Sequence, residues 1–203
     1  MHTARETEHA EDGLRRIAAG FATLGLLAAC SGGTTEPATP ANSSAPSAVD
    51  PSLKVPAPLA TDQLLDSPCD VLTAAETAQV GLAYPGRKST DVLTSCQWTS
   101  SGSRENFVGI SALPQNKGGI SDIYDQKSSQ AYFQPVTIDG YPGVFASKAD
   151  GRPSGNCVLW VGATDQLAFS VNPQIGTGHN KANPCGLAQQ IATVVITHLK
   201  AQD

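Results

Sequence analysis

The sequence predicts an α+β domain: an antiparallel sheet of about five or six strands, helices at both ends of the domain packed on one face, and two disulfides. Period-two segments fill the middle of the chain, and amphipathic helical segments flank them near residues 73–80 and 186–200. Turn signals such as Asp139-Gly140 separate the strand segments. Helices segregated from a run of antiparallel strands are typical of this class.

The two terminal helices have clear start and stop signals. Thr73 followed by Glu76 forms a capping box, and Gly81 is a natural residue just past the helix end, so the first helix should run to about Val80. The last helix should span residues 186–200. It places these residues along one side: Leu187, Ile191, Val194, Val195 and His198.

Six segments between the helices alternate or cluster apolar residues as strands do. They cover residues 93–99, 106–113, 133–138, 141–147, 157–163 and 167–171, with a short helix near 120–127. Pro135 and Pro142 should push their strands toward a sheet edge or a bulge, because proline cannot donate to the ladder. Residues 172–184 read as a polar loop.

The chain's start indicates export and lipid anchoring. Arg15-Arg16 precedes a short apolar run that ends in Leu27-Ala28-Ala29-Cys30, which has the form of a lipobox. Residues 1–29 are therefore predicted to be a signal peptide, by the general or the twin-arginine route, and Cys30 to carry the lipid. Such an anchor would hold the protein on the extracytoplasmic face of the cell membrane.

Domain organisation follows from composition. Residues 30–62 are rich in Ser, Thr, Pro and Ala without apolar periodicity, which predicts a disordered tether. Residues 63–203 should form a single disulfide-bonded domain. Thirteen Lys and Arg against eighteen Asp and Glu leave no basic balance that would indicate a nucleic-acid partner.

Four cysteines remain once Cys30 is assigned to the lipid, and an even number outside the cytoplasm predicts two disulfides. Pro68-Cys69 and Pro184-Cys185 each precede a helix, whereas Cys96 and Cys157 each lie in a strand. The simplest pairing is Cys69–Cys96 and Cys157–Cys185. Four cysteines allow three connectivities, and the sequence alone excludes none of them.

These features resemble those of a family of actinobacterial cell-envelope lipoproteins whose domain has no assigned function. The resemblance rests on the lipobox, the tether, Pro68-Cys69-Asp70-Val71-Leu72-Thr73 and Cys96-Gln97-Trp98. More loosely, the domain looks like the extracellular sensor domains of mycobacterial serine/threonine kinases, which implies an antiparallel sheet with two disulfides and a cleft. Neither resemblance brings catalytic residues.

The search for chemistry yields few candidates. The sequence has no Gly-x-Ser-x-Gly, Ser-x-x-Lys, His-Glu-x-x-His or phosphate loop, and we expect no cofactor or metal. His179, Trp98 and Trp160 are the candidate ligand contacts, and no residue is proposed as catalytic. The sequence favours a non-catalytic ligand-binding or sensing module. The alternatives are an interaction scaffold in an envelope complex and a hydrolase without a visible motif.

Overall fold

The computed structural model describes residues 50–89 and 93–202, and these form one folded unit. The predicted signal peptide 1–29, Cys30 and the tether up to residue 49 lie outside the described residues. None of the helices in the described ranges is long and apolar enough to cross a membrane.

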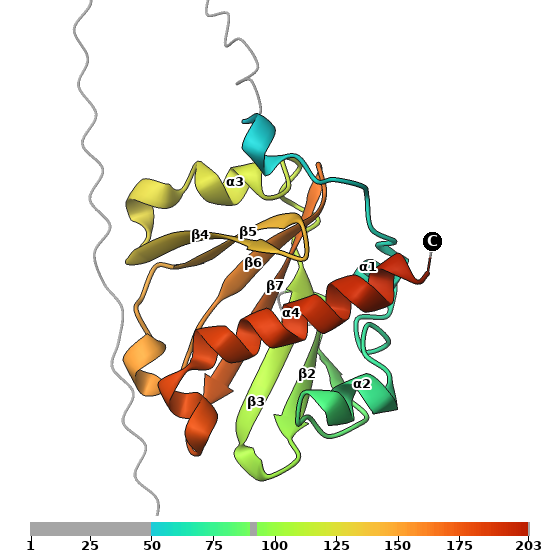
Figure 1. The fold of residues 1–203 in the computed structure, drawn as a ribbon, viewed down its shortest axis with the longest axis vertical. Coiled ribbons are helices and arrows are strands. Elements are labelled where there is room, and N and C mark those ends of the chain that lie inside the picture. Colours follow the sequence, from blue (N-terminus) through green and yellow to red (C-terminus); the bar gives the residue numbers. More distant parts are fainter. Residues whose placement is uncertain (1–49, 90–92, 203) are drawn as a thin grey trace, which may run out of the picture. The chain divides into compact units, whose positions relative to one another are not determined.

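The described chain folds into a seven-stranded antiparallel sheet with helices on both faces (Figure 1). The strands are β1 (Arg87–Ser89), β2 (Ser95–Ser100), β3 (Ser103–Ala112), β4 (Tyr132–Ile138), β5 (Tyr141–Ser147), β6 (Leu159–Thr164) and β7 (Leu167–Ile175). The helices are α1 (Asp62–Asp66), α2 (Ala74–Gln79), α3 (Ser121–Tyr124) and α4 (Pro184–Lys200). Short 3-10 turns are η1 (Pro51–Leu53), η2 (Lys127–Ser129), η3 (Arg152–Ser154) and η4 (His179–Ala182).

The strand order is β1-β2-β3-β7-β6-β5-β4, so the chain returns to the centre of the sheet with its last strand. β2 and β3, β4 and β5, and β6 and β7 pair as antiparallel neighbours in sequence. The Asp139-Gly140 turn between β4 and β5 has positive φ at both residues, 50° and 88°, as a two-residue hairpin requires. The antiparallel sheet and the two disulfides are as predicted, whereas the number of strands is not.

The seventh strand is β1, which is not among the six strand segments that the sequence predicts. It has only three residues and two of them are exposed, so it carries no apolar alternation that a sequence reading could detect. It forms by pairing with β2, where Lys88 lies opposite Cys96. Tertiary pairing, not local preference, makes this segment a strand.

β7 is also longer than predicted, because it continues into the expected polar loop as far as Ile175. Pro173 lies in this central strand opposite Val108 of β3. The Pro173 carbonyl accepts a hydrogen bond from the Cys157 N–H at 3.3 Å. Because the nitrogen and the carbonyl of a strand residue point to the same side, the Pro173 nitrogen also faces away from β3, at a position beyond the end of β6. The hydrogen bonds between β7 and β3 therefore lose no donor.

The two hairpin prolines behave differently. Pro135 lies in the edge strand β4, as its missing donor suggested. β5 is an interior strand, so the prediction of an edge or bulge for Pro142 is wrong. Pro142 is tolerated because pairing between β5 and β6 begins only at Gly143.

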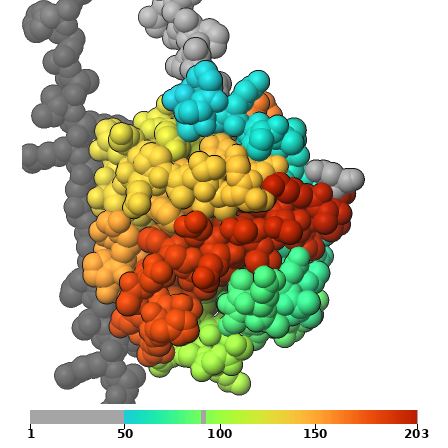
Figure 2. All heavy atoms as spheres, viewed as in Figure 1, coloured from blue at the N-terminus to red at the C-terminus, as the bar shows by residue number. Residues whose placement is uncertain are grey.

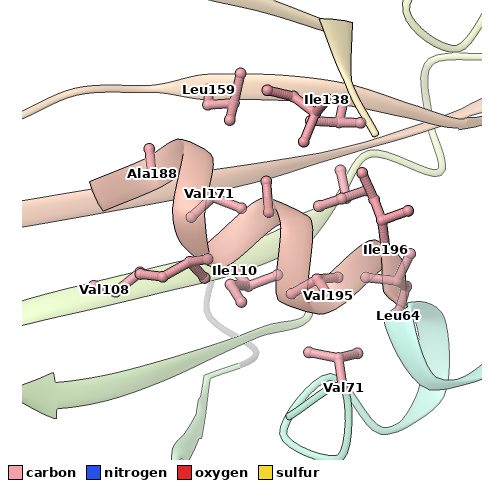
Figure 3. Close-up of a cluster of buried hydrophobic side chains, with 14 of the residues drawn as sticks. Leu64, Val71, Val108, Ile110, Ile138, Leu159, Val171, Ala188, Val195 and Ile196 are labelled. Carbon is pink, nitrogen blue, oxygen red and sulfur yellow. The ribbon is translucent and has the colours of Figure 1, made fainter. Parts of the chain in front are cut away.

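One face of the sheet is covered by α1, α2 and α4, which enclose the main hydrophobic core (Figure 1). Figure 3 shows Val195 of α4 beside Ile110 of β3, and Ile196 of α4 on the side of Leu64, in the same cluster as Val171 of β7. Leu64 of α1 and Val71 close the same cluster from the side. In Figure 2 this face is filled by α4 with α2 beside it. α4 itself begins at Pro184, two residues earlier than predicted, with Asn183 as its cap.

The second face has a smaller cluster, covered by α3 and η1 at one end of the sheet (Figure 1). Leu53 of η1 and Ile123 of α3 pack there on Val144, Ala146 and Ala168. The prediction of helices packed on one face is therefore only partly matched, since α1, α2 and α4 lie on one face and α3 lies on the other. α3 is too short to cover the whole of this face, which leaves part of it open.

The folded region begins before Gln63, the predicted domain start. The Leu59 N–H donates to the Ala163 carbonyl at 2.9 Å, and the Val55 N–H donates to the Asp165 carboxylate at 3.1 Å. Leu53 and Leu59 are buried. These apolar residues are separated by prolines and polar residues, so their composition resembled a tether although they pack as a strap on the sheet.

Two disulfides fix the helix entries to the strands, in the predicted pairing. Cys69 is bonded to Cys96 of β2, and Cys157 is bonded to Cys185 of α4. The Cys69–Cys96 bridge ties the segment before α2 to one side of the sheet, and the other bridge ties the start of α4 to the start of β6. The covered face is thus cross-linked near both ends.

Candidate functional site

The open part of the second face contains a hollow of about 420 Å³ between α3, η2 and strands β5 and β6. We call it the main hollow. It is lined by Leu113, Asn116, Ile123, Gln126, Gln130, Ala146, Ser147, Lys148, Val158 and Trp160. Its floor is apolar, its rim carries side-chain amides, and its volume lies in the range of small-ligand sites.

A second hollow of about 270 Å³ adjoins it, and we call this the side hollow. It is lined by Tyr132, Ser147, Ala149, Gly151, Asn156, Val158, Asn172 and Gln174. Ser147 and Val158 belong to both linings, so the two hollows are neighbours on the surface. Asn172 and Gln174 reach this face because they alternate along β7 with Val171 and Ile175, which belong to the main core.

Trp160 is the aromatic residue of the main hollow. Its neighbours Leu159 and Val161 are buried in the main core, so strand alternation directs Trp160 to the second face. The indole N–H donates to the Ala146 carbonyl at 3.1 Å, which fixes the orientation of the ring. The side chain is half-buried. The structure thus presents a rigid indole on the floor of an open hollow.

The charges around the hollows are largely neutralised. Arg152 donates two hydrogen bonds to Asp150, at 2.8 and 2.7 Å, and its guanidinium lies 4.1 Å from the centre of the Tyr132 ring. The Arg152 hydrogen bonds lower the pKa of Asp150 to about 2. Burial raises the pKa of Tyr132, so this phenol stays protonated at neutral pH, and its oxygen accepts from the Val158 N–H at 3.0 Å. Lys148 is the remaining charged residue of the linings.

A second polar cluster joins α1, α2 and α4. His198 Nδ1 lies 3.1 Å from a Glu76 carboxylate oxygen, and its Nε2 lies 2.8 Å from Gln63 Oε1. Glu76 also caps α2, since its carboxylate accepts from the Thr73 N–H at 2.7 Å. Partial burial acts to raise the pKa of Glu76, but the Thr73 hydrogen bonds and His198 outweigh it, and the pKa is lowered.

This cluster has the imidazole and carboxylate of a hydrolase but not the nucleophile. The Nε2 position, where a nucleophilic hydroxyl would stand, is occupied by an amide. His198 is buried between helices, on the side of α4 that carries the apolar residues. Among residues 50–89 and 93–202, no group of three or more His, Cys, Asp or Glu side chains could hold a metal ion. The cluster is best explained as a joint between helices.

The structure separates the three predicted ligand contacts. Trp160 lines the main hollow, as described above. Trp98 lies on the opposite face, is 0% exposed, and packs in the main core beside Gly86. Its indole nitrogen has no hydrogen-bond partner among the described residues, but nothing from solvent can reach it in this conformation. The structure therefore assigns Trp98 to the core and not to a ligand site.

His179 lies in η4, outside both hollows on the second face. It lines a small polar depression of about 240 Å³ between the β2–β3 turn and the segment that follows β7. Asn106 holds this segment in place, because its side chain donates to the Thr177 carbonyl at 2.9 Å and accepts from the Thr177 N–H at 3.1 Å. The depression is lined by polar side chains and glycine, and it has no apolar floor.

Sequence reasoning missed most residues of the hollows. Asn172 and Gln174 alternate with apolar residues from Leu167 to Ile175, and this signal could have extended the strand had Pro173 not interrupted it. Lys148, Asn116 and Ser147 carry no such signal, since each follows or ends a strand. Only the packing of α3 against β5 and β6 brings them to one site.

Fold and site define a class: a small disulfide-bonded α+β domain with an aromatic-floored hollow on the partly open face of an antiparallel sheet. The sequence model of the family described as "Protein of unknown function (DUF3558)" matches residues 25–198, which is most of the chain, and the protein belongs to this family. No curated protein and no solved structure matches the chain.

Proposed function

We propose that this protein is a lipid-anchored extracytoplasmic lipoprotein whose domain binds a small ligand, without catalysis, in the main hollow. The observation that carries the binding proposal is the hollow itself. A rigid indole lies on its apolar floor, and amide side chains surround it. Such a combination of apolar contact and a few convergent polar groups is what ligand sites use.

The anchoring proposal rests on Leu27-Ala28-Ala29-Cys30 at the end of an apolar run. The described fold is compatible with it, since the strap that begins at residue 50 packs on the sheet and would leave the preceding segment as a spacer. Replacing Cys30 with Ala should abolish metabolic labelling by a fatty acid and release the protein from the membrane fraction. Unchanged labelling would contradict the proposal.

The scaffold alternative has less support. The two sheet edges are β1, with three residues, and β4, which contains Pro135. A partner strand could pair with neither edge over a long, uninterrupted ladder. The hollow is therefore the better candidate for recognition.

The binding proposal is tested with protein purified from native membranes. Small molecules released by denaturation are identified by mass spectrometry and compared with those from Ser147→Trp, which fills the junction of the two hollows. Thr99→Trp is the matched control, because Thr99 is exposed on β2 and lines neither hollow. We expect an enriched species that Ser147→Trp loses and Thr99→Trp retains. Identical profiles for all three proteins would contradict the proposal.

A further inference from the structure

We infer that the main and side hollows together form one elongated site for an oligosaccharide of N-acetylated sugars. This inference rests on the proposed ligand-binding function and specifies its ligand class. The two hollows adjoin at Ser147 and Val158, and their linings together extend from α3 to β7. Two adjoining compartments suit a ligand of more than one ring.

The strongest observation is a set of half-buried amide side chains without intramolecular partners. Asn116, Asn156, Asn172 and Gln174 line the hollows, and their side chains make no hydrogen bond to any other described residue. Each primary amide offers two donors and an acceptor. Hydroxyl and acetamido groups present both donors and acceptors, so such a ligand can replace the water at these positions without leaving a polar group unpaired.

Charge narrows the ligand further. Among the residues that the structure describes, no carboxylate lines either hollow, and Lys148 is the one lining side chain with a formal charge. Arg152, close to the side hollow, is paired with Asp150. A cationic ligand would find no counter-ion here and would be repelled by Lys148. The site therefore fits a neutral or anionic molecule.

The orientation of the Trp160 indole favours a sugar over a peptide as the ligand. Because the Trp160 N–H is already bonded to Ala146, the ring offers its face and not its polar edge. The C–H face of a pyranose ring can pack on such a surface, and a rigid ring loses little entropy on binding. An extended peptide usually pairs with a free strand edge, but β5, β6 and β7 are all interior strands.

The test titrates the full chain in detergent with the N-acetylglucosamine tetramer, followed by calorimetry and by the indole N–H resonance of Trp160. We expect saturable binding with a shift of that resonance. The glucosamine tetramer, which lacks the acetyl groups and carries ammonium groups, should bind at least about tenfold more weakly. Asn172→Leu should raise the dissociation constant of the acetylated tetramer about tenfold, because it replaces the amide with an apolar side chain of similar size.

Gln97→Leu is the matched control, since Gln97 is an exposed amide on β2 outside both hollows, and it should bind as the wild type does. N-acetyl-trialanine amide is the peptide probe. Equal affinity for both tetramers, no binding of either, or tighter binding of the peptide would overturn the inference. If the inference fails while Ser147→Trp still loses a co-purified molecule, the proposed function stands with another ligand class. If Ser147→Trp loses no co-purified molecule, the proposed function fails, whatever the result of the titration.

Discussion

The two faces of the sheet are built from alternate residues of the same strands, yet one is closed and the other is partly open. Phe169 and Val171 of β7 are fully buried under α4, whereas Asn172 and Gln174 of the same strand face a hollow. The closed face has a seventeen-residue helix and both disulfides, and the open face has a four-residue helix and two 3-10 turns. The difference places most of the buried apolar core on one side of the sheet and the proposed ligand site on the other.

The largest expected loss of stability comes from a substitution in the core of the closed face. Phe169→Ala removes a fully buried ring from the centre of the main core and should lower the free energy of unfolding by about 3–5 kcal/mol. Asn172→Ala, three positions along the same strand, should change it by less than about 0.5 kcal/mol, because its half-buried amide has no partner among the described residues. Urea unfolding of both variants measures the contrast, and equal losses would contradict it.

The next effect concerns the bridge at the start of α4. Removing it with the double change Cys157→Ser and Cys185→Ser opens a loop closed across 28 residues and should cost about 3–4 kcal/mol in the chain-entropy account. Thermal unfolding with and without reductant checks this. Reductant opens both bridges, so the wild type in reductant should lose at least as much stability as the double variant loses without reductant. A double variant as stable as the wild type would show that this bridge contributes little.

The smallest expected change in stability tests the joint between helices on the closed face, which contains Glu76. Glu76 has a lowered pKa in the folded state, so its contribution to stability is present above its ordinary value of 4.5 and is lost as the pH falls through the lowered value. Glu76→Gln keeps the shape of the capping box and should lower the free energy of unfolding by about 0.5–1 kcal/mol at pH 7.

The same variant should flatten the pH dependence of stability below pH 4.5, the ordinary value for Glu76. Glu105→Gln is the control, since Glu105 is exposed at the β2–β3 end of the sheet and contacts no helix cap. Chemical denaturation between neutral and acidic pH measures both variants. A Glu76→Gln curve parallel to that of the wild type would contradict the assigned pKa shift.

Much of the fold could be predicted because its signals are local. The Thr73–Glu76 capping box, the Asp139-Gly140 hairpin turn and the one-sided apolar stripe of α4 each depend on residues a few positions apart. β1 and the end of β7 were missed because a strand partner, and not the segment's own pattern, makes them strands. The site was found only at Trp160, since its other residues come from separate segments.

The sequence by itself determined the class of fold, the alternation that divides each strand between two faces, and an even set of four cysteines that predicts two disulfides, although it excluded none of the three pairings. It did not determine which alternate set of residues would be covered. Trp98 and Trp160 both lie in strands near a cysteine, and only the tertiary structure places one in the core and the other in the hollow. The physical reason is that a strand presents both faces equally, and the lengths and positions of α3 and α4 decide which face excludes water.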